Sequence, residues 1–408
     1  MPVAQLDAAL GGDVLSRYLR DLGLKDVSQV VTSEDVGYFS ALGRYLTQEN
    51  LPSLKCLCKL QLINAYGDYL TNDVAQALDR MVQFEPYMDF NAGEADCPPF
   101  APAPYASPYA SATGAELLAF VRDYAQEDLA VAYANAYAPE GAREKLTALT
   151  HQITQAFCAR IRALDWMAER TKQSAIQKLN AIGREFVSPD AYPHIEIKDT
   201  LFDTMASVHV ARRTCAINQV NDRAHYRKHW EMASDTVNAC YDNVTHTICV
   251  PAGILRAPFY DADRLVGSIG LIIGHELTHG FDDNGSHDDE NGYEKDWWTP
   301  EDRAVFAKKT REVAAYYSRW PYRAGRAQAG DTIVGECIAD LGSLGMMMDL
   351  LDGDPDAQRE ALINFAGQWV QAGTDEQLDG VVNAGKGLTT LPYPNATMTN
   401  PVVARGQV

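Results

Sequence analysis

The sequence HELTH at residues 275–279 requires a helix if its two histidines are to act together. In an α-helix, positions i and i+4 share one face, so His275 and His279 can bind one metal ion. Residues 269–273 are apolar and Gly280 follows, which is typical of a buried helix that ends there. The motif therefore predicts a buried helix with a metal site. Two histidines in a polar core are the alternative that the motif alone leaves open.

Glu276 directly follows the first histidine and can lean toward the open side of a metal ion held by the two rings. A carboxylate at that position can take a proton from a water that the metal ion activates. The sequence therefore predicts Glu276 as a general base.

A second segment, GECIAD at residues 335–340, provides the acidic groups that such a site needs. Glu336 can be the third protein ligand of a zinc ion, and Asp340 can accept the N–H of a ligand histidine and fix its tautomer. A solvent-facing acidic pair is the alternative, but the apolar residues 341–351 that follow argue against it. We predict one Zn²⁺ per chain; Co²⁺ or Mn²⁺ can occupy the same ligand set.

Hydrophobic periodicity predicts a mainly helical chain with a small β element. A proline-rich loop at residues 97–112 interrupts the helical periodicity, and residues 186–200 also lack it. We therefore expect a helical domain over residues 1–200 and a second domain over residues 201–408. A short β-like run covers residues 247–250, and the expected helices of the second domain cover 265–282, 300–319, 335–351 and 358–371.

The composition excludes several classes of function. With 35 basic and 55 acidic residues, the net charge of −20 leaves no basic patch for nucleic acid. No segment approaches the ~18 apolar residues of a membrane-spanning helix, and the first residues lack the regions of a secretion signal. Eight irregularly spaced cysteines are interpreted as free thiols. These features predict a cytoplasmic protein of undetermined oligomeric state.

Several motifs together resemble one family. They are the residues 274–285, 296–299, 335–342, 237–241 and 251–255, with support from 164–167 and 364–366. In combination they are similar to the neprilysin family of zinc metallopeptidases, the M13 peptidases, which include endothelin-converting enzymes and bacterial oligopeptidase O. The resemblance covers residues 150–408, and more weakly residues 14–90.

The resemblance implies a zincin-like, thermolysin-like catalytic domain with a helical cap. It implies His275, His279 and Glu336 as zinc ligands, Glu276 as general base and Asp340 as the partner of a ligand histidine. It also implies an endopeptidase that cleaves oligopeptides on the amino side of large hydrophobic residues. The implied peptide-backbone contacts are Asn238 and Ala239, and the implied lining of the S1′ pocket is Ile254, Phe259, Ile272 and Trp369, for which ordinary core packing is the alternative.

The chain departs from the family pattern at several positions. Cys337 replaces an Asn and Ser343 a Gly, and a thiol beside a zinc ligand suggests sensitivity to oxidation. Arg405 matches the family Arg that stabilises the oxyanion, but Thr399 stands where the family has a His. Losing one such donor typically lowers kcat by roughly 10²–10³-fold, so reduced activity is expected. The chain also lacks a counterpart to both family termini.

These departures leave two alternatives to a working peptidase. One is a homologue that retains zinc and binds peptides but is catalytically impaired; the presence of Glu276 argues against it, because a binder needs no general base. The other is an incomplete fragment of a larger peptidase. A serine or cysteine hydrolase is not favoured, because no G-x-S-x-G motif occurs.

Overall fold

The computed structural model describes residues 1–30, 34–66, 69, 113–190, 192, 194–222, 230, 232–319, 321–323, 326–327 and 330–368. The proline-rich segment at 97–112, Trp369, Thr399 and Arg405 lie outside the described residues, so the predictions made for them stay predictions. The chain divides into two compact units, which are described separately below.

The two units are not consecutive halves that meet near residue 200. Unit 1 comprises Met1–Asp128 and Pro193–Tyr226, and unit 2 comprises Leu129–Tyr192 and Arg227–Val408. Residues 129–192 belong with unit 2 because helix α8 (Ala142–Ala163) buries Leu146, Leu149 and Ile153 in the same core as the HELTH helix. A boundary drawn from local composition does not register such long-range packing. The assignment of cap and catalytic roles to the two parts stays a prediction.

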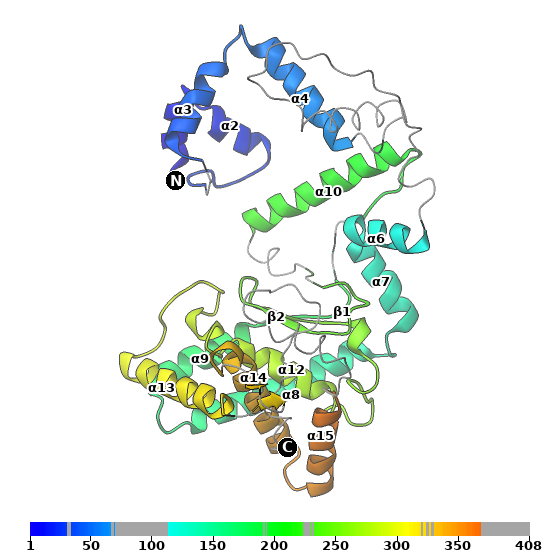
Figure 1. Cartoon of the computed structure of the whole chain (residues 1–408), viewed down its shortest axis with the longest axis vertical. Coiled ribbons are helices and arrows are strands. Elements are labelled where there is room, and N and C mark those ends of the chain that lie inside the picture. The colour runs from blue at the N-terminus through cyan, green and yellow to red at the C-terminus, as the bar shows by residue number, and fades with distance from the viewer. Residues whose placement is uncertain are drawn as a thin grey trace. The chain divides into compact units, whose positions relative to one another are not determined.

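The regular elements that the structure describes in unit 1 are helices, joined by loops and one isolated bridge between Pro2 and Gln29. Within it, α1 packs against α2 and α3, and the Asp7 carboxylate accepts hydrogen bonds from the backbone N–H groups of Leu15 and Ser16 at the start of α2. Its helices are α1 (Val3–Leu10), α2 (Val14–Asp21), α3 (Val36–Tyr45), α4 (Leu51–Tyr66), α6 (Gly114–Tyr124), the start of α7 (Gln126–Tyr137) and α10 (Leu201–Asn221) (Figure 1).

Unit 2 combines long helices with a small sheet, which confirms the predicted fold class of a mainly α protein with a small β element. In the sheet, β3 (Thr247–Pro251) lies between β1 (Gly183–Val187), to which it is parallel, and β2 (Cys240–Asp242), to which it is antiparallel. The remaining elements are α9 (Glu169–Ala181), η3 (Ala252–Ile254), α12 (Ile269–His279), η4 (Gly285–His287), α13 (Pro300–Tyr317), β4 (Pro321–Arg323), β5 (Arg326–Ala327), α14 (Gly330–Leu350) and α15 (Pro355–Gln368).

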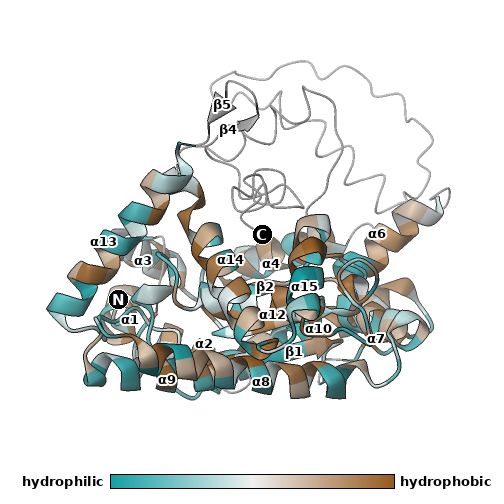
Figure 2. Cartoon of the chain, turned by 90° about the horizontal axis from the view of Figure 1, so that it is seen from below, coloured by the Kyte–Doolittle hydropathy of each residue, from teal (hydrophilic) through white to brown (hydrophobic). Residues whose placement is uncertain are grey.

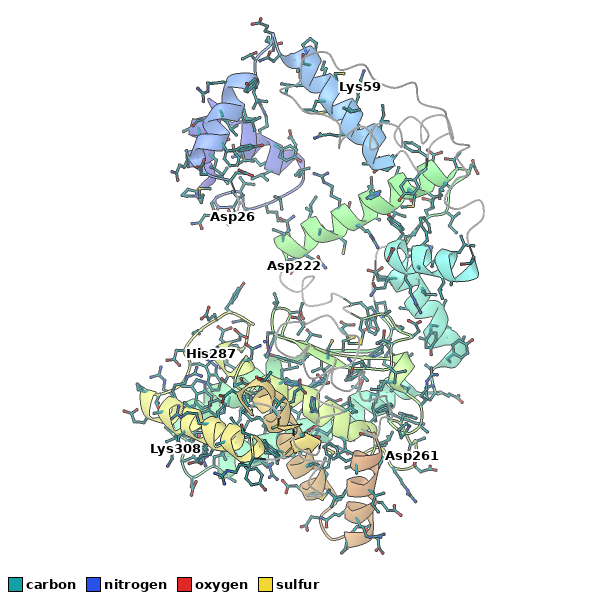
Figure 3. The ribbon with its side chains drawn as sticks, viewed as in Figure 1. Asp26, Lys59, Asp222, Asp261, His287 and Lys308 are labelled. Carbon is teal, nitrogen blue, oxygen red and sulfur yellow. The ribbon has the colours of Figure 1, made fainter. Side chains whose placement is uncertain are left out.

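The HELTH helix α12 is the centre of the core of unit 2. Nine of its eleven residues are buried, and Figure 2 shows it coloured largely as hydrophobic. The more polar α13 lies at the surface, where Lys308 is exposed, as are Asp261 and His287 elsewhere in unit 2 (Figure 3). Because α12 is buried along most of its length, its polar side chains need hydrogen-bond partners from neighbouring elements.

Small residues allow α14 to pack closely against α12. A Cβ atom at Gly274 would lie 2.8 Å from Ser343 Oγ, so the contact requires glycine at this position. Ser343, which stands where the family has glycine, donates from its hydroxyl to the Leu271 carbonyl at 2.5 Å. This close contact brings the N-terminal half of α14 beside the histidines of α12.

Among the helices that the structure describes, none is long and apolar enough to cross a membrane. The seven cysteines within the described part of the chain are free thiols.

Candidate metal centre

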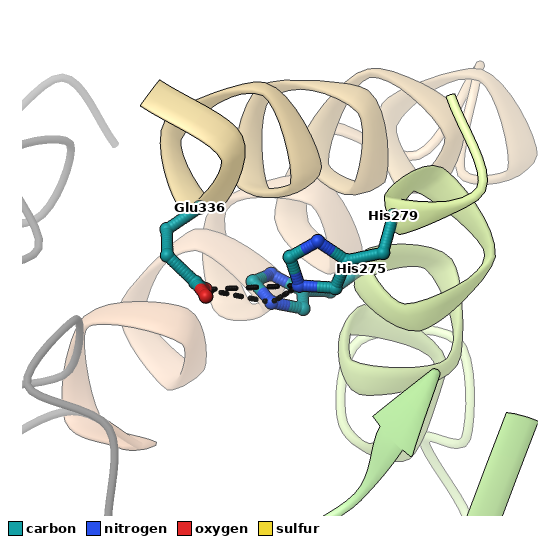
Figure 4. Close-up of side chains that lie close together, drawn as sticks. All are labelled: His275, His279 and Glu336. Carbon is teal, nitrogen blue, oxygen red and sulfur yellow. Dashed lines mark hydrogen bonds and ion pairs between the residues drawn. The ribbon is translucent and has the colours of Figure 1, made fainter. Parts of the chain in front are cut away.

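Three side chains from two helices converge at one point in unit 2. His275 Nε2 and His279 Nε2 lie 2.9 Å apart, and Glu336 Oε2 lies 3.2 Å from the first and 3.7 Å from the second (Figure 4). In a tetrahedral zinc site with bonds of about 2.0–2.1 Å, ligand atoms lie about 3.3 Å apart. The three atoms therefore have the spacing of three corners of a zinc tetrahedron. Within the described residues they form the one trio of this kind.

Two carboxylates outside the trio orient the imidazole rings. His275 Nδ1 donates to Asp340 Oδ1 at 2.9 Å, and His279 Nδ1 donates to Asp282 Oδ2 at 2.7 Å. In the neutral form of each ring, which is the form that binds a metal ion, this bond places the proton on Nδ1 and leaves the Nε2 lone pair toward the trio. Asp340 was expected in this position from the sequence. Asp282 was not, although an acidic residue three positions after His279 was the available signal.

The ionisable groups of the site shift one another's pKa values. Burial alone would lower the pKa of His275, but hydrogen bonds to Asp340 and Glu336 and their negative charges raise it well above its usual value. Burial alone would raise the pKa of Glu336, yet the hydrogen bond from His275 and the charges of the two imidazoles lower it to about 2. Glu336 therefore stays ionised, as a metal ligand must.

Glu276 lies on the buried side of the same helix and is 6% exposed. Burial raises the pKa of its carboxyl, while His275, His279 and a hydrogen bond from the Tyr241 backbone N–H oppose that rise. The Tyr241 backbone in strand β2 thus favours the ionised form of Glu276. A raised pKa makes this carboxylate a better proton acceptor than an exposed glutamate.

Of the residues expected to contact a peptide, two lie beside strand β2 and three lie in or against the hydrophobic core. Asn238 and Ala239 directly precede β2, and Ala239 is buried. Ile254 and Ile272 are buried in the hydrophobic core, and Phe259 packs against it. These positions are compatible with core packing, so the pocket assignment stays a prediction.

His246, outside the HELTH motif, is not available to replace the family His. His246 is fully buried and its ring is engaged, because Nε2 donates to the Lys178 carbonyl and Nδ1 accepts from the Tyr241 hydroxyl. His287 is exposed in η4.

Burial argues against an oxidation-sensitive thiol at Cys337. The side chain is 1% exposed, and burial together with the charges of Asp340 and Glu336 raises its pKa far above the usual range. Because the thiolate is the reactive form, Cys337 should be inert in the folded protein.

We therefore expect iodoacetamide to modify the exposed Cys56 and Cys58 of the native protein but to leave Cys337 unmodified. Peptide mapping by mass spectrometry after timed alkylation measures this, with denatured protein as the control in which all three react. Equal rates at Cys337 and Cys56 in native protein would contradict the buried, protonated thiol.

Two histidines and a glutamate in one helical motif, with a carboxylate from a neighbouring helix, form the arrangement typical of HExxH zinc peptidases. Two family models, both described as Peptidase family M13, match residues 1–189 and 238–368. The chain belongs to peptidase family M13.

Relatives and solved structures agree with this membership. A neutral endopeptidase of Lactobacillus helveticus is 26% identical over 367 residues, which are 88% of this chain and 53% of the relative. Human neprilysin is 31% identical over 215 residues, 48% of this chain and 28% of its own length. The open state of the zinc metalloprotease Zmp1 of Mycobacterium tuberculosis matches 98% of this chain and 62% of its own length, with a TM-score of 0.66 and 25% identity. The chain thus spans about half the length of the first curated relatives it matches.

Proposed function

We propose that this chain is a zinc-dependent endopeptidase that hydrolyses oligopeptides on the amino side of large hydrophobic residues. The observation that carries the proposal is the convergence of His275 Nε2, His279 Nε2 and Glu336 Oε2 beside the buried Glu276. The neutral endopeptidases among its relatives support the reaction class.

His275, His279 and Glu336 would hold the metal ion, and they fit zinc in donor type, number and spacing. Zinc in such a site supplies Lewis-acid chemistry, lowering the pKa of water and polarising a carbonyl. Asp340 and Asp282 keep the two imidazoles in the tautomer that leaves Nε2 free.

Glu276 carries the proton in this proposal. Its carboxylate takes a proton from the attacking water and afterwards gives it to the leaving amine. The Tyr241 backbone and the two imidazoles favour the ionised form of this carboxyl, in which it can accept a proton. Arg405 is proposed to stabilise the oxyanion, and Asn238 and Ala239 to bind the peptide backbone beside edge strand β2.

The preference for a large hydrophobic residue is proposed to come from Ile254, Phe259, Ile272 and Trp369. The first three are apolar side chains in or against the core of unit 2, which also contains the HELTH helix. An apolar pocket there would favour Phe or Leu after the scissile bond by burying its surface.

The direct test is incubation of the purified chain with a quenched peptide that carries a central Phe or Leu, with zinc content measured in parallel. We expect cleavage before the apolar residue, abolished by a chelator and restored by zinc, because the metal site is required for the reaction. The matched control is the same peptide with Asp in place of the apolar residue, which should be cleaved more slowly.

Three observations favour a second reading, an impaired or incomplete enzyme. Thr399 replaces the family His, and the chain spans only about half of its first curated relatives. In unit 1, α4 also exposes the large apolar side chains Leu57, Leu62 and Ile63. Stoichiometric zinc without cleavage would favour this reading, and rescue by Thr399→His would then assign the defect to the missing oxyanion donor.

A further inference from the structure

A buried lysine outside the metal centre is not used by the proposed mechanism. Lys178 lies on α9, and only 1% of its surface is exposed. Its ammonium donates to the backbone carbonyls of Gly285 at 2.5 Å and Asp288 at 2.6 Å. It also lies over the rings of Phe281, at 5.5 Å, and Trp297, at 5.9 Å. All its partners belong to the chain segment that directly follows the HELTH helix.

Three hydrogen bonds connect this ammonium to a predicted metal ligand. Gly285 accepts from Lys178 through its carbonyl and donates its own N–H to Asp282 Oδ1 at 2.7 Å. The other oxygen of Asp282 accepts from His279 Nδ1 at 2.7 Å. Gly285 itself cannot carry a side chain, because a Cβ would lie 2.0 Å from the His279 carbonyl. The loop of residues 281–289 therefore packs directly onto the end of α12.

Burying an ammonium is unfavourable unless its charge and its donors are compensated. Burial lowers the pKa of Lys178 to about 8, although the carboxylates of Asp288, Asp282 and Asp289 act to raise it. A methionine would fill a similar volume without this cost. The buried charge is therefore best explained by the hydrogen bonds that the ammonium donates to the two loop carbonyls.

Other contacts secure the fold around this lysine. Trp298 Nε1 donates to the Ser286 carbonyl at 3.0 Å, and the start of α9 is bound by the buried Asp302, which accepts from Thr171 Oγ1 at 2.5 Å and from the Ala168 N–H. Removal of the ammonium should therefore leave α9 and most of the loop in place. The Gly285 carbonyl keeps the Asp288 N–H as a donor, and Asp282 Oδ1 keeps the N–H groups of Asn284 and Gly285. What is lost is the attachment of this loop to α9, so the expected change is a shift of the loop that moves the Asp282 carboxylate with it.

We propose that Lys178 is a positioning residue of the metal centre, which holds the 281–289 loop so that Asp282 fixes the ring of His279. The inference rests on the proposed zinc site and does not depend on peptidase activity. It predicts that Lys178 and Asp282 affect metal affinity through the same series of hydrogen bonds, which ends at His279.

The test is the zinc dissociation constant, measured by competition with a chromogenic chelator, for the native chain, Lys178→Met, Asp282→Asn and the double variant. We expect Lys178→Met and Asp282→Asn each to weaken zinc binding by about 10–100-fold, as loss of an outer partner of a ligand histidine does. The double variant should be no weaker than Asp282→Asn alone, because both changes break one path. The absorption spectrum of the Co²⁺-loaded protein should shift in Lys178→Met.

The matched control is Lys172→Met on the same helix. Lys172 also donates to a backbone carbonyl, that of Arg162, but it does not contact the loop. This variant should bind zinc as the native chain does. If Lys178→Met does not fold, Lys178→Gln, which keeps an N–H donor and removes the charge, takes its place.

Native zinc affinity and an unchanged Co²⁺ spectrum in a folded Lys178 variant would overturn the inference, even if the apoprotein melts earlier. Additive effects in the double variant would overturn it as well. Absence of zinc binding by the native chain would instead refute the proposed function, so the two failures are distinguishable.

Discussion

Glu276→Gln is expected to lower kcat for peptide hydrolysis by about 10²–10⁴-fold while the chain keeps one zinc ion. The amide has nearly the shape of the carboxyl but cannot take a proton from water. Glu276 is not one of the three residues whose ligand atoms converge, so replacing it leaves the three predicted metal ligands in place. Single-turnover kinetics with the quenched peptide and metal analysis of the same sample measure the two quantities together.

The control for this change is Glu301→Gln, which removes an equal charge at an exposed position in the first turn of α13. It should leave both zinc content and kcat close to native values. Loss of zinc together with activity in Glu276→Gln would refute the role of general base and would make Glu276 part of the metal-binding set.

Glu336→Gln is expected to weaken zinc binding by more than about 100-fold, since loss of an outer partner alone costs 10–100-fold. The change replaces a carboxylate whose pKa is about 2 with a neutral amide, which is a poor zinc ligand, and removes the charge that faces both imidazoles. Activity should return in part when zinc is added in large excess, because Glu276 remains in place.

Asp331→Asn provides the comparison on the same helix. Asp331 is exposed in the first turn of α14, away from the buried face that carries Asp340. The zinc affinity of the Asp331→Asn variant should match that of the native chain. Equal zinc affinities for Glu336→Gln and Asp331→Asn would show that Glu336 is not a ligand.

The metal trio could be predicted from sequence because helical spacing is a local property. HELTH fixes the two imidazoles on one face, and the acidic residues at 336 and 340 fall on one face of a second helix. That these two faces meet depends on the close packing of Gly274 against Ser343, which no local pattern shows. The need of a zinc site for a third protein ligand suggests that step, and the resemblance to a known family supports it.

Other features could not be predicted because they depend on distant contacts. Strand β1 has no alternation of polar and apolar residues that would separate it from a helix end, and it forms because β3 lies beside it. Lys178 occurs in an ordinary helical pattern, and its importance depends on carbonyls more than a hundred residues away. The grouping of residues 129–192 with unit 2 has the same origin.

The parallel pairing of β1 with β3 also has a consequence for synthesis on the ribosome. Gly183 pairs with Thr247, and α10 of the other unit lies between them in the chain. At 5–20 residues per second, β1 therefore waits roughly 3 to 13 seconds for its partner strand to be made. During that interval α8 and α9 can pack against each other, but the later partners of α8, which are α12 and α14, are still to be made. Nascent chains stalled before residue 247 are thus the species in which this protein most needs a chaperone.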